Sequence, residues 1–212
     1  MKNISLYSMS IQKLISHFNS YLSLNIEETA AVTKIATERN IKRRQFILQE
    51  GDRCKHYNFV VSGCFKMYNV DNAGKEHNLQ FGAENAWITD MASFHSVKPV
   101  DFKNPNAGKP SQLFIEAVES SVIIQIAQKD LVFLFENFPK FNRIFRVIVE
   151  NNFIELQNRM LQNISMTAEE RYLSFLEQYP DLSNRLPNTQ IASFLGITPE
   201  FLSNIRKSIA DK

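Results

Sequence analysis

The sequence contains little cysteine, glycine or tryptophan, and it has no long apolar run. Its 212 residues include two cysteines, six glycines and one tryptophan. The two cysteines, Cys54 and Cys64, are too few for the disulfide framework of a small secreted domain and suit a reducing compartment. No stretch approaches the roughly 20 apolar residues of a membrane helix, and the N-terminus has no signal-peptide core. We therefore expect a cytoplasmic protein that does not contact a membrane.

Common catalytic and metal-binding motifs are also absent. The four histidines, at positions 17, 56, 77 and 95, lie far apart, whereas metal enzymes cluster their ligands in patterns such as His-Glu-x-x-His. There is no Gly-x-Ser-x-Gly motif, no P-loop and no dinucleotide-binding fingerprint. The sequence therefore predicts a protein that is not an enzyme and that holds no metal or cofactor.

Charge of either sign is not in strong excess. The net charge of the whole chain is +2, and residues 165–212 carry five Lys/Arg against six Asp/Glu, a net of −1. Because neutralisation of phosphates drives nucleic-acid affinity, this balance argues mildly against DNA binding. The length suits one large or two small domains with a real core.

The C-terminal stretch 186–212 has the pattern of two short helices joined by a tight turn. The first helix is predicted from Thr189 to Leu195 and ends at Gly196, since glycine takes the left-handed conformation at little cost. Thr198, Pro199 and Glu200 then form a strong helix start, because threonine caps free N–H groups, proline needs no N–H there, and glutamate suits the positive end of the dipole. This pattern is typical of a helix-turn-helix, whose second helix enters the DNA major groove.

The second helix is predicted to have two faces. An inner face is predicted for Phe201, Leu202, Ile205 and Ile209, while Glu200, Ser203, Asn204 and Lys207 point outward. The spacing from Gln190-Ile191-Ala192 through Leu195-Gly196-Ile197 to Arg206-Lys207 resembles the C-terminal helix-turn-helix of the cyclic-AMP-receptor-protein and Fnr (Crp/Fnr) family of bacterial transcription regulators. Glu200 falls where that family has a base-reading glutamate, and Asn204 falls where it usually has an arginine. The predicted DNA-binding residues are Gln190, Thr198, Pro199, Glu200, Ser203, Asn204, Arg206 and Lys207.

The first part of the chain alternates strand-like runs with turn signals. Two helices are predicted over residues 4–36, and from Glu38 to Ala127 short β-like runs alternate with glycine-containing turns, as in a sandwich or barrel. The glycines at 51, 63, 74 and 82, with the run Tyr57-x-x-Val60-x-Ser62-Gly63, resemble the cyclic-nucleotide-binding jelly roll. The resemblance thus covers nearly the whole chain and implies an effector-sensing domain.

The residues that would hold a cyclic nucleotide are missing. Family members that bind cyclic AMP use Gly-Glu-Leu for the ribose and Arg-Ser or Arg-Ala for the phosphate, because a guanidinium fork fits a phosphodiester. The matching stretches here are 86–91, without Gly-Glu, and 109–112, without arginine; Lys103 or Lys109 could only partly replace it. A polar loop from His95 to Gly108 lies between them. The resemblance implies either no small effector or a different one, near Trp87, Asp90, Met91 and Ser111, and we expect no binding of cyclic AMP.

Residues 131–164 read as helical, interrupted at Pro139. From Phe141 an apolar stripe recurs in steps of three or four, as in a coiled-coil seam, through Phe145, Ile148, Asn152, Leu156 and Met160. In the family this long helix forms the dimer interface. A core helix packed on its own barrel would also show this stripe, with Ile144, Val147 and Phe153 as further apolar positions.

Together these patterns predict an α+β protein in three parts. They are a β jelly-roll sensor domain (1–130), a dimerisation helix region (131–164) and a helix-turn-helix domain (165–212) that lacks a C-terminal wing. The predicted function is that of a sequence-specific DNA-binding transcription regulator, with double-stranded DNA and a second copy of the chain as partners. A ligand-binding or protein-interaction module with a degenerate helix-turn-helix is the alternative, favoured by the weak charge and by Asn204.

Overall fold

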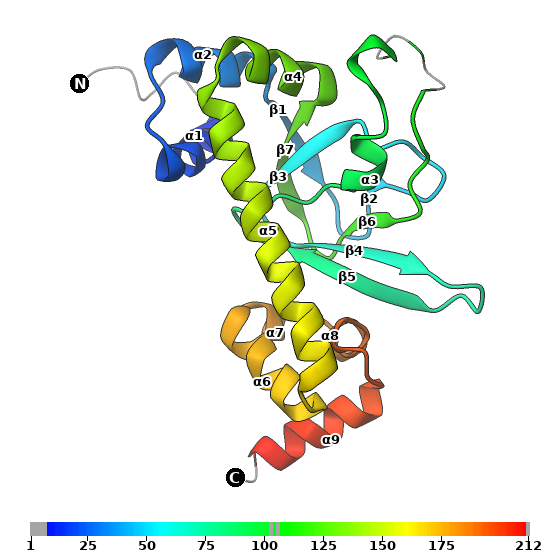
Figure 1. Ribbon diagram of the computed structural model, residues 1–212. Coiled ribbons are helices and arrows are strands. Elements are labelled where there is room, and N and C mark those ends of the chain that lie inside the picture. Colours follow the sequence, from blue (N-terminus) through cyan, green and yellow to red (C-terminus); the bar gives the residue numbers. More distant parts are fainter. Residues whose placement is uncertain (1–7, 102–103, 105–106, 211–212) are drawn as a thin grey trace. The chain divides into compact units, whose positions relative to one another are not determined.

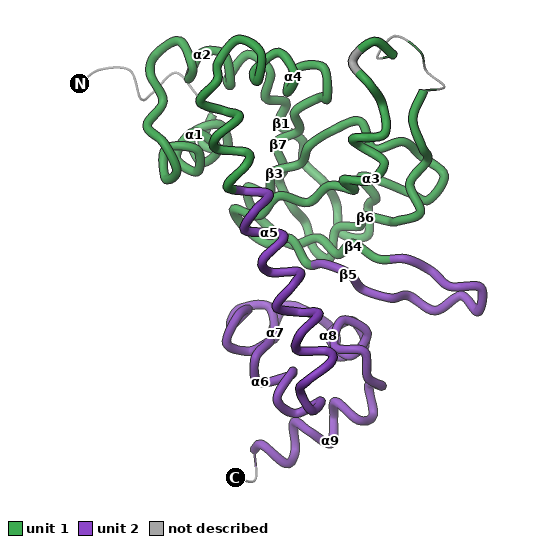
Figure 2. The backbone as a smooth tube through the Cα atoms, in the orientation of Figure 1, with its two compact units in different colours: residues 1–68, 81–147 green, residues 69–80, 148–212 purple. Residues whose placement is uncertain are grey.

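Helices and strands of the chain fall into two compact units (Figures 1 and 2). The structure is a computed structural model that describes residues 8–101, 104 and 107–210; Lys103 and the outermost ends of the first and last predicted domains lie outside these residues. Unit 1 comprises residues 1–68 and 81–147, and unit 2 comprises residues 69–80 and 148–212. One boundary between the units falls inside one long helix, between residues 147 and 148.

The strands form two sheets. The strands are β1 (Thr37–Ile41), β2 (Phe46–Leu48), β3 (His56–Ser62), β4 (Phe65–Val70), β5 (Glu76–Gly82), β6 (Phe114–Ala117) and β7 (Ser121–Ala127). One sheet has the order β1-β7-β3 and the other β2-β6-β4-β5. The β1–β7, β3–β7, β2–β6 and β4–β6 pairs are antiparallel. This confirms the predicted α+β class with antiparallel sheets.

Among the described residues, five helical segments belong wholly to unit 1, and one long helix continues from unit 1 into unit 2. The five are α1 (Met9–Tyr21), α2 (Ile26–Ile35), α3 (Met91–Phe94), the 3₁₀ helix η2 (Pro99–Asp101) and α4 (Gln128–Asn137), and the long helix is α5 (Lys140–Ser165). Pro139 separates α4 from α5, as the sequence predicts, since proline disrupts a helix interior.

An aromatic cluster fills the core of unit 1. Phe18, Phe59 and Phe141 are fully buried, and Trp87 and Phe145 are nearly so. Trp87 lies with its ring centroid 5.1 Å from that of Phe59 and 5.5 Å from that of Phe145. Burying aromatic side chains of this size supplies much of the hydrophobic stabilisation of a domain. This cluster therefore accounts for some of the 17 phenylalanines of the chain.

One turn of the sandwich depends on a glycine. Gly63, between β3 and β4, has φ +91°, and a Cβ placed on it would lie 2.1 Å from Ser121 Oγ. A side chain at this position is therefore excluded both by backbone conformation and by space. The close approach lets the β3–β4 turn pack against the start of β7.

Unit 2 contains the rest of α5 and four further helices. These are α6 (Ala168–Gln178), α7 (Leu182–Arg185), α8 (Asn188–Leu195) and α9 (Pro199–Ala210). A capping box fixes the start of α6, where Thr167 Oγ1 accepts from the Glu170 N–H and the Glu170 carboxylate accepts from the Thr167 N–H. Residues 69–80, the outer part of the β4–β5 hairpin, also belong to this unit. Among the described residues, which end at Ala210, no strand follows α6. The absence of a wing stays a prediction.

Candidate DNA interface and sensor site

The α8–α9 pair has the geometry predicted for a helix-turn-helix. Gly196 closes α8 in the left-handed conformation, with φ +69° and ψ 32°, and its N–H donates to the last turn. Thr198 Oγ1 accepts from the Phe201 N–H at 3.2 Å, which caps α9. Pro199 is the first residue of α9, where a missing N–H costs nothing. The turn chemistry of the sequence therefore gives the two-helix motif.

The exposed face of α9 carries most of the predicted base-reading residues. Glu200, Asn204 and Lys207 are exposed and Ser203 is half-buried; their spacing of three and four residues places them on one side of the helix. Leu202 and Ile205 form the inner face, with 0% and 6% of their surface exposed. Phe201 was predicted to be on the inner face, but 51% of its surface is exposed, although it lies one turn before the buried Ile205.

Two of the predicted DNA-binding residues are held by their own unit. The Arg206 guanidinium lies over the Tyr172 ring, 5.4 Å from its centroid, and its Nε is buried with no hydrogen-bond partner. The Gln190 side-chain oxygen is likewise buried and unpaired, while its backbone carbonyl accepts from Asn78 Nδ2 at 3.1 Å. Thr198 and Pro199 sit at the start of α9, where Thr198 is exposed and Pro199 is half-buried.

The predicted effector residues Asp90 and Ser111 meet in unit 1. Asp90 is the N-cap of α3, and its Oδ1 accepts from the N–H groups of Ala92 at 3.0 Å and Ser93 at 3.2 Å. Ser111 Oγ donates to the other oxygen, Oδ2, at 2.7 Å. Both side chains are buried, with 4% and 3% of their surface exposed. A carboxylate of the chain itself therefore occupies the donors at this end of α3.

The other two predicted effector residues, Trp87 and Met91, do not take part in the hydrogen bond between Asp90 and Ser111. Trp87 is buried in the aromatic cluster, and its Nε1–H donates to His17 Nε2 at 3.0 Å, so its polar atom is already satisfied. Burial lowers the pKa of His17, which suits an acceptor nitrogen at neutral pH. Met91 begins α3 and is 37% exposed. The Lys109 side chain is exposed, and its carbonyl accepts from Ser93 Oγ.

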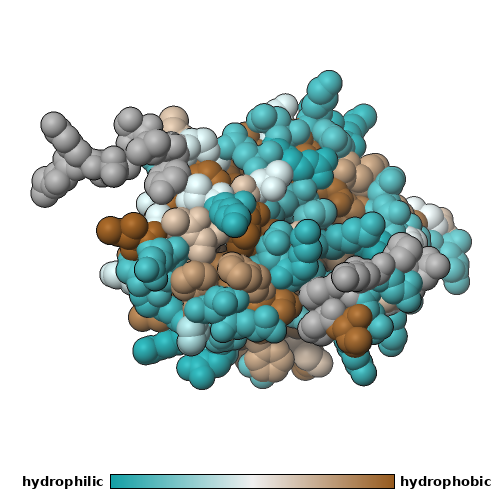
Figure 3. All heavy atoms as spheres, turned by 90° about the horizontal axis from the view of Figure 1, so that it is seen from above, coloured by the Kyte–Doolittle hydropathy of each residue, from teal (hydrophilic) through white to brown (hydrophobic). Residues whose placement is uncertain are grey.

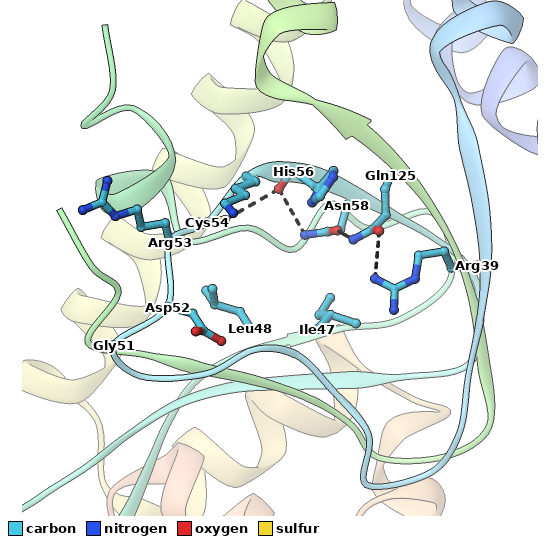
Figure 4. A pocket seen from close by; sticks show the side chains of 11 residues that line it. Arg39, Ile47, Leu48, Gly51, Asp52, Arg53, Cys54, His56, Asn58 and Gln125 are labelled. Atoms are coloured by element: carbon cyan, nitrogen blue, oxygen red, sulfur yellow. Dashed lines mark hydrogen bonds between the residues drawn. The ribbon is translucent and has the colours of Figure 1, made fainter. Parts of the chain in front are cut away.

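A cavity of about 470 Å³ opens elsewhere in unit 1 (Figure 4). Its walls come from β1, β2, β3, β7 and the loop between β2 and β3, and neither Asp90 nor Ser111 lines it. Sequence reasoning missed this cavity. It depends on Arg39 and Gln125, which lie 86 residues apart in the chain, and no local pattern links them.

The predicted dimerisation helix behaves differently along its length. Phe141, Phe145 and Ile148 are buried, with 0%, 5% and 3% of their surface exposed, and Phe145 packs against Tyr57 and Trp87 of unit 1. This first half of the predicted stripe is a core helix face. From Val149 onward an apolar row is exposed, which consists of Val149, Phe153, Leu156, Met160 and Ile164. Its first four members repeat in steps of four, three and four residues, the spacing of a coiled-coil seam.

In the part of the chain that the structure describes, no three His, Cys, Asp or Glu side chains gather closely enough to hold a metal ion. None of the helices described is long and apolar enough to span a membrane. The face seen in Figure 3 is mostly hydrophilic, with apolar residues scattered over it.

The described residues thus combine two sheets, a long helix and a helix-turn-helix. Residues 38–138 match the family of cyclic nucleotide-binding domains. Over 182 residues the chain is 25% identical to the regulatory protein HlyX of Actinobacillus pleuropneumoniae, a match that covers 81% of this chain and 70% of HlyX. It is 23% identical to the transcriptional activator Anr of Pseudomonas aeruginosa, over 87% of this chain and 75% of Anr.

A solved structure supports the same fold. A candidate transcriptional regulator of the Crp/Fnr family from Eubacterium rectale superimposes with a TM-score of 0.68 at 14% identity, covering 92% of this chain and 88% of that one. Together these similarities support a regulator of the Crp/Fnr family. The curated relatives named above are regulatory proteins, and they support a DNA-binding regulator with a sensory domain.

Proposed function

We propose that this regulator reads a specific DNA sequence as a homodimer, with α9 as the recognition helix. The observation that carries the proposal is the row Glu200, Asn204 and Lys207, which is exposed on a capped helix whose opposite side is buried by Leu202 and Ile205. A glutamate can accept from the cytosine amino group, and an asparagine can form a bidentate pair with adenine. The lysine supplies a phosphate contact.

Dimerisation compensates for the low charge of one helix-turn-helix. Residues 165–212 carry a net charge of −1, so one copy has little electrostatic affinity for DNA. Two copies joined through the exposed row of α5 would hold two recognition helices for half-sites about 34 Å apart. Exposed leucine, methionine and phenylalanine at seam spacing support this interface, because water-exposed apolar rows are rare on monomers.

The sensory domain is proposed not to take cyclic AMP. Asp90 already uses the N–H groups of Ala92 and Ser93 and the Ser111 hydroxyl. A cyclic phosphate placed there would lose those donors and meet a buried carboxylate, and like charges in a buried site are costly. The absent arginine removes the fork that would offset this cost.

Selection of bound sequences from a random DNA pool tests the proposal. A single enriched motif with two symmetric half-sites, bound by the purified chain across a salt series, is the expected result. If no sequence is enriched, or if the enriched sequences bind no more tightly than random DNA, the alternative is favoured. That alternative is a ligand-binding or protein-interaction module with a degenerate helix-turn-helix.

A further inference from the structure

The cavity in unit 1 contains a chain of buried carboxamides that ends at a cation. Asn58 and Gln125 are 3% and 4% exposed. Asn58 Nδ2 donates to the carbonyls of His56 and Ile88 at 3.2 and 3.0 Å, so its Oδ1 must face the other way. That oxygen accepts from Gln125 Nε2 at 2.7 Å. The orientation of both amides is thereby fixed.

This chain positions the guanidinium of Arg39. With its Nε2 used by Asn58, Gln125 presents Oε1 to Arg39, whose Nη1 donates to it at 3.0 Å. An arginine has five N–H donors in a planar fork, and within the described residues Arg39 makes only this side-chain hydrogen bond. Figure 4 shows Arg39 at one side of the cavity, beside Gln125. The remaining donors are therefore available at a wall whose geometry is set by buried groups.

Positive charge prevails around the cavity. Three cations, Arg39, Arg53 and Lys55, line the cavity, against the single carboxylate of Asp52. Arg53 Nη1 donates to the Ala107 carbonyl, and Figure 4 draws its side chain away from the cavity. Burial, and then the charges of Arg39 and Lys55, lower the pKa of His56, so that imidazole is neutral near pH 7. The field favours an anion.

Opposite Asn58 and Gln125 the cavity presents two apolar side chains together with Asp52 (Figure 4). Ile47 and Leu48 of β2 line the cavity (Figure 4), where they can contact a carbon skeleton. A volume of about 470 Å³ lies in the range of small-molecule sites. One anchored guanidinium suits the two oxygens of a planar carboxylate, and the neighbouring apolar side chains favour a ligand with a carbon skeleton over an inorganic anion.

We propose that this cavity is the effector site of the sensory domain and that its ligand is a small organic carboxylate. Its carboxylate would pair with Arg39, and its carbon skeleton would lie against Ile47 and Leu48. The inference rests on the proposed function, because it assigns a ligand class to the sensory domain. It places that ligand away from Asp90 and Ser111, where the sequence pattern put it.

Thermal unfolding of the full chain with defined probes tests the site. The probes are sodium acetate, succinate, 2-oxoglutarate and benzoate, with sodium chloride at matched ionic strength and inorganic phosphate as comparisons. At least one carboxylate is expected to raise Tm by about 2 °C or more over chloride, and calorimetry then gives its Kd. No carboxylate binding below millimolar Kd, or tighter binding of phosphate, would overturn the proposal.

Substitutions of Arg39 distinguish binding at the cavity from general effects of the added salts. Arg39 is exposed, so Arg39→Gln and Arg39→Lys should fold; Arg39→Gln removes the charge and Arg39→Lys removes the fork. Both should weaken carboxylate binding at least about tenfold, whereas Arg43→Gln, at another exposed arginine that does not line the cavity, should leave it unchanged. Equal binding by all three variants would sink the assignment. Because these measurements use no DNA, their failure leaves the DNA-binding proposal standing, and loss of DNA binding leaves this one standing.

Discussion

The guanidinium of Arg159 lies over the ring of Phe194, with Cζ 3.6 Å from the ring centroid, and so joins α5 to α8 within unit 2. Nη2 of Arg159 also donates to the carbonyls of Phe194 at 2.9 Å and Asn78 at 3.1 Å, and Nη1 donates to that of Leu79. One side chain thus connects the long helix, the first helix of the helix-turn-helix and the outer part of the β4–β5 hairpin.

Replacing Arg159 should loosen the DNA-binding unit. Arg159→Met keeps the aliphatic stem but leaves three carbonyls without their donor, which should lower the free energy of unfolding by about 1–3 kcal/mol. Arg159→Lys should recover only part of this, because an ammonium cannot stack or serve three acceptors as a fork does. Urea unfolding measures the loss, and Arg143→Met, at an exposed position of α5, is the control. Equal stability of the two methionine variants would contradict the connecting role.

Glu200→Ala should relax base preference at one position of each half-site. The expected loss of discrimination is about 1–3 kcal/mol, since the cytosine amino group loses its acceptor. Lys207→Ala should instead weaken binding to all sequences alike and reduce the salt dependence. Sequence selection and anisotropy titrations measure both effects, with Glu177→Ala, at an exposed position of α6, as the control. A Glu200→Ala protein with unaltered base preference would show that another residue reads the base.

A double change of Leu156→Asp and Met160→Asp should convert dimers to monomers. Both side chains are exposed in the single chain, at 61% and 65%, so charge there should oppose pairing without disturbing the fold. Phe145 and Ile148 are unsuitable for this test because they are buried in their own chain. Equilibrium sedimentation gives the mass, and Asn151→Asp with Asn158→Asp, exposed on the same helix, is the matched control. A monomeric parent protein would remove the basis for the interface.

Cyclic AMP and cyclic GMP should give no calorimetric signal at micromolar concentrations, because Asp90 fills the anion donors of α3. Asp90→Ala should also destabilise unit 1 by about 0.5–2 kcal/mol through loss of the cap. Asp181→Ala serves for comparison, since Asp181 stands at the N-cap of α7 but makes no side-chain cap bond, and it should change stability by less than about 0.5 kcal/mol. Micromolar binding of either nucleotide to the parent chain is the contrary result.

Stability should fall on acidification through the pair Glu28–Lys140. Burial opposes ionisation of Glu28, but hydrogen bonds from Lys140 and from the Asn25 N–H outweigh it and lower its pKa below 4.5; Lys140 Nζ lies 2.6 Å from Oε2. A carboxyl whose pKa is lower in the folded state stabilises above its unfolded pKa, and the contribution disappears as pH falls through the folded value. Glu28→Gln should therefore cost about 1–2 kcal/mol at pH 7 and little near pH 2. Glu27→Gln, exposed on α2, should show the parent pH profile, and a parallel profile for Glu28→Gln would refute the assignment.

Local chemistry made the helix-turn-helix predictable, while tertiary contacts made other parts unpredictable. Gly196 and Thr198 fix the turn by their own backbone and hydroxyl groups, which a sequence shows directly. Strand β1 was missed because Thr37–Asn40 has no apolar alternation and only Ile41 is buried. Its pairing with β7 depends on residues 80 or more positions away.

The strand β5 shows how a partner element reverses a pattern. Strict alternation would place Leu79 on one face with the buried Phe81 and Asn78 on the other face, yet Leu79 is 43% exposed, whereas Asn78 is only 3% exposed. The Asn78 N–H donates to Ser193 Oγ at 3.0 Å, and its Nδ2 donates to the Gln190 carbonyl. Hydrogen bonds to α8 therefore outweigh the burial of one leucine, and neither partner is visible from the strand's own sequence. The Asp90 cap is local and could have been found, since Asp before a short helix is a common N-cap.

The exposed apolar row on α5, as the proposed dimer interface, would make DNA binding depend on the concentration of the protein. If two copies must dimerise before they bind two half-sites, the occupancy of the operator rises with the square of the monomer concentration while most of the protein is monomeric. A twofold change in synthesis or degradation then alters occupancy about fourfold by mass action. The concentration of the effector and the concentration of the protein would thus both determine the occupancy of one promoter.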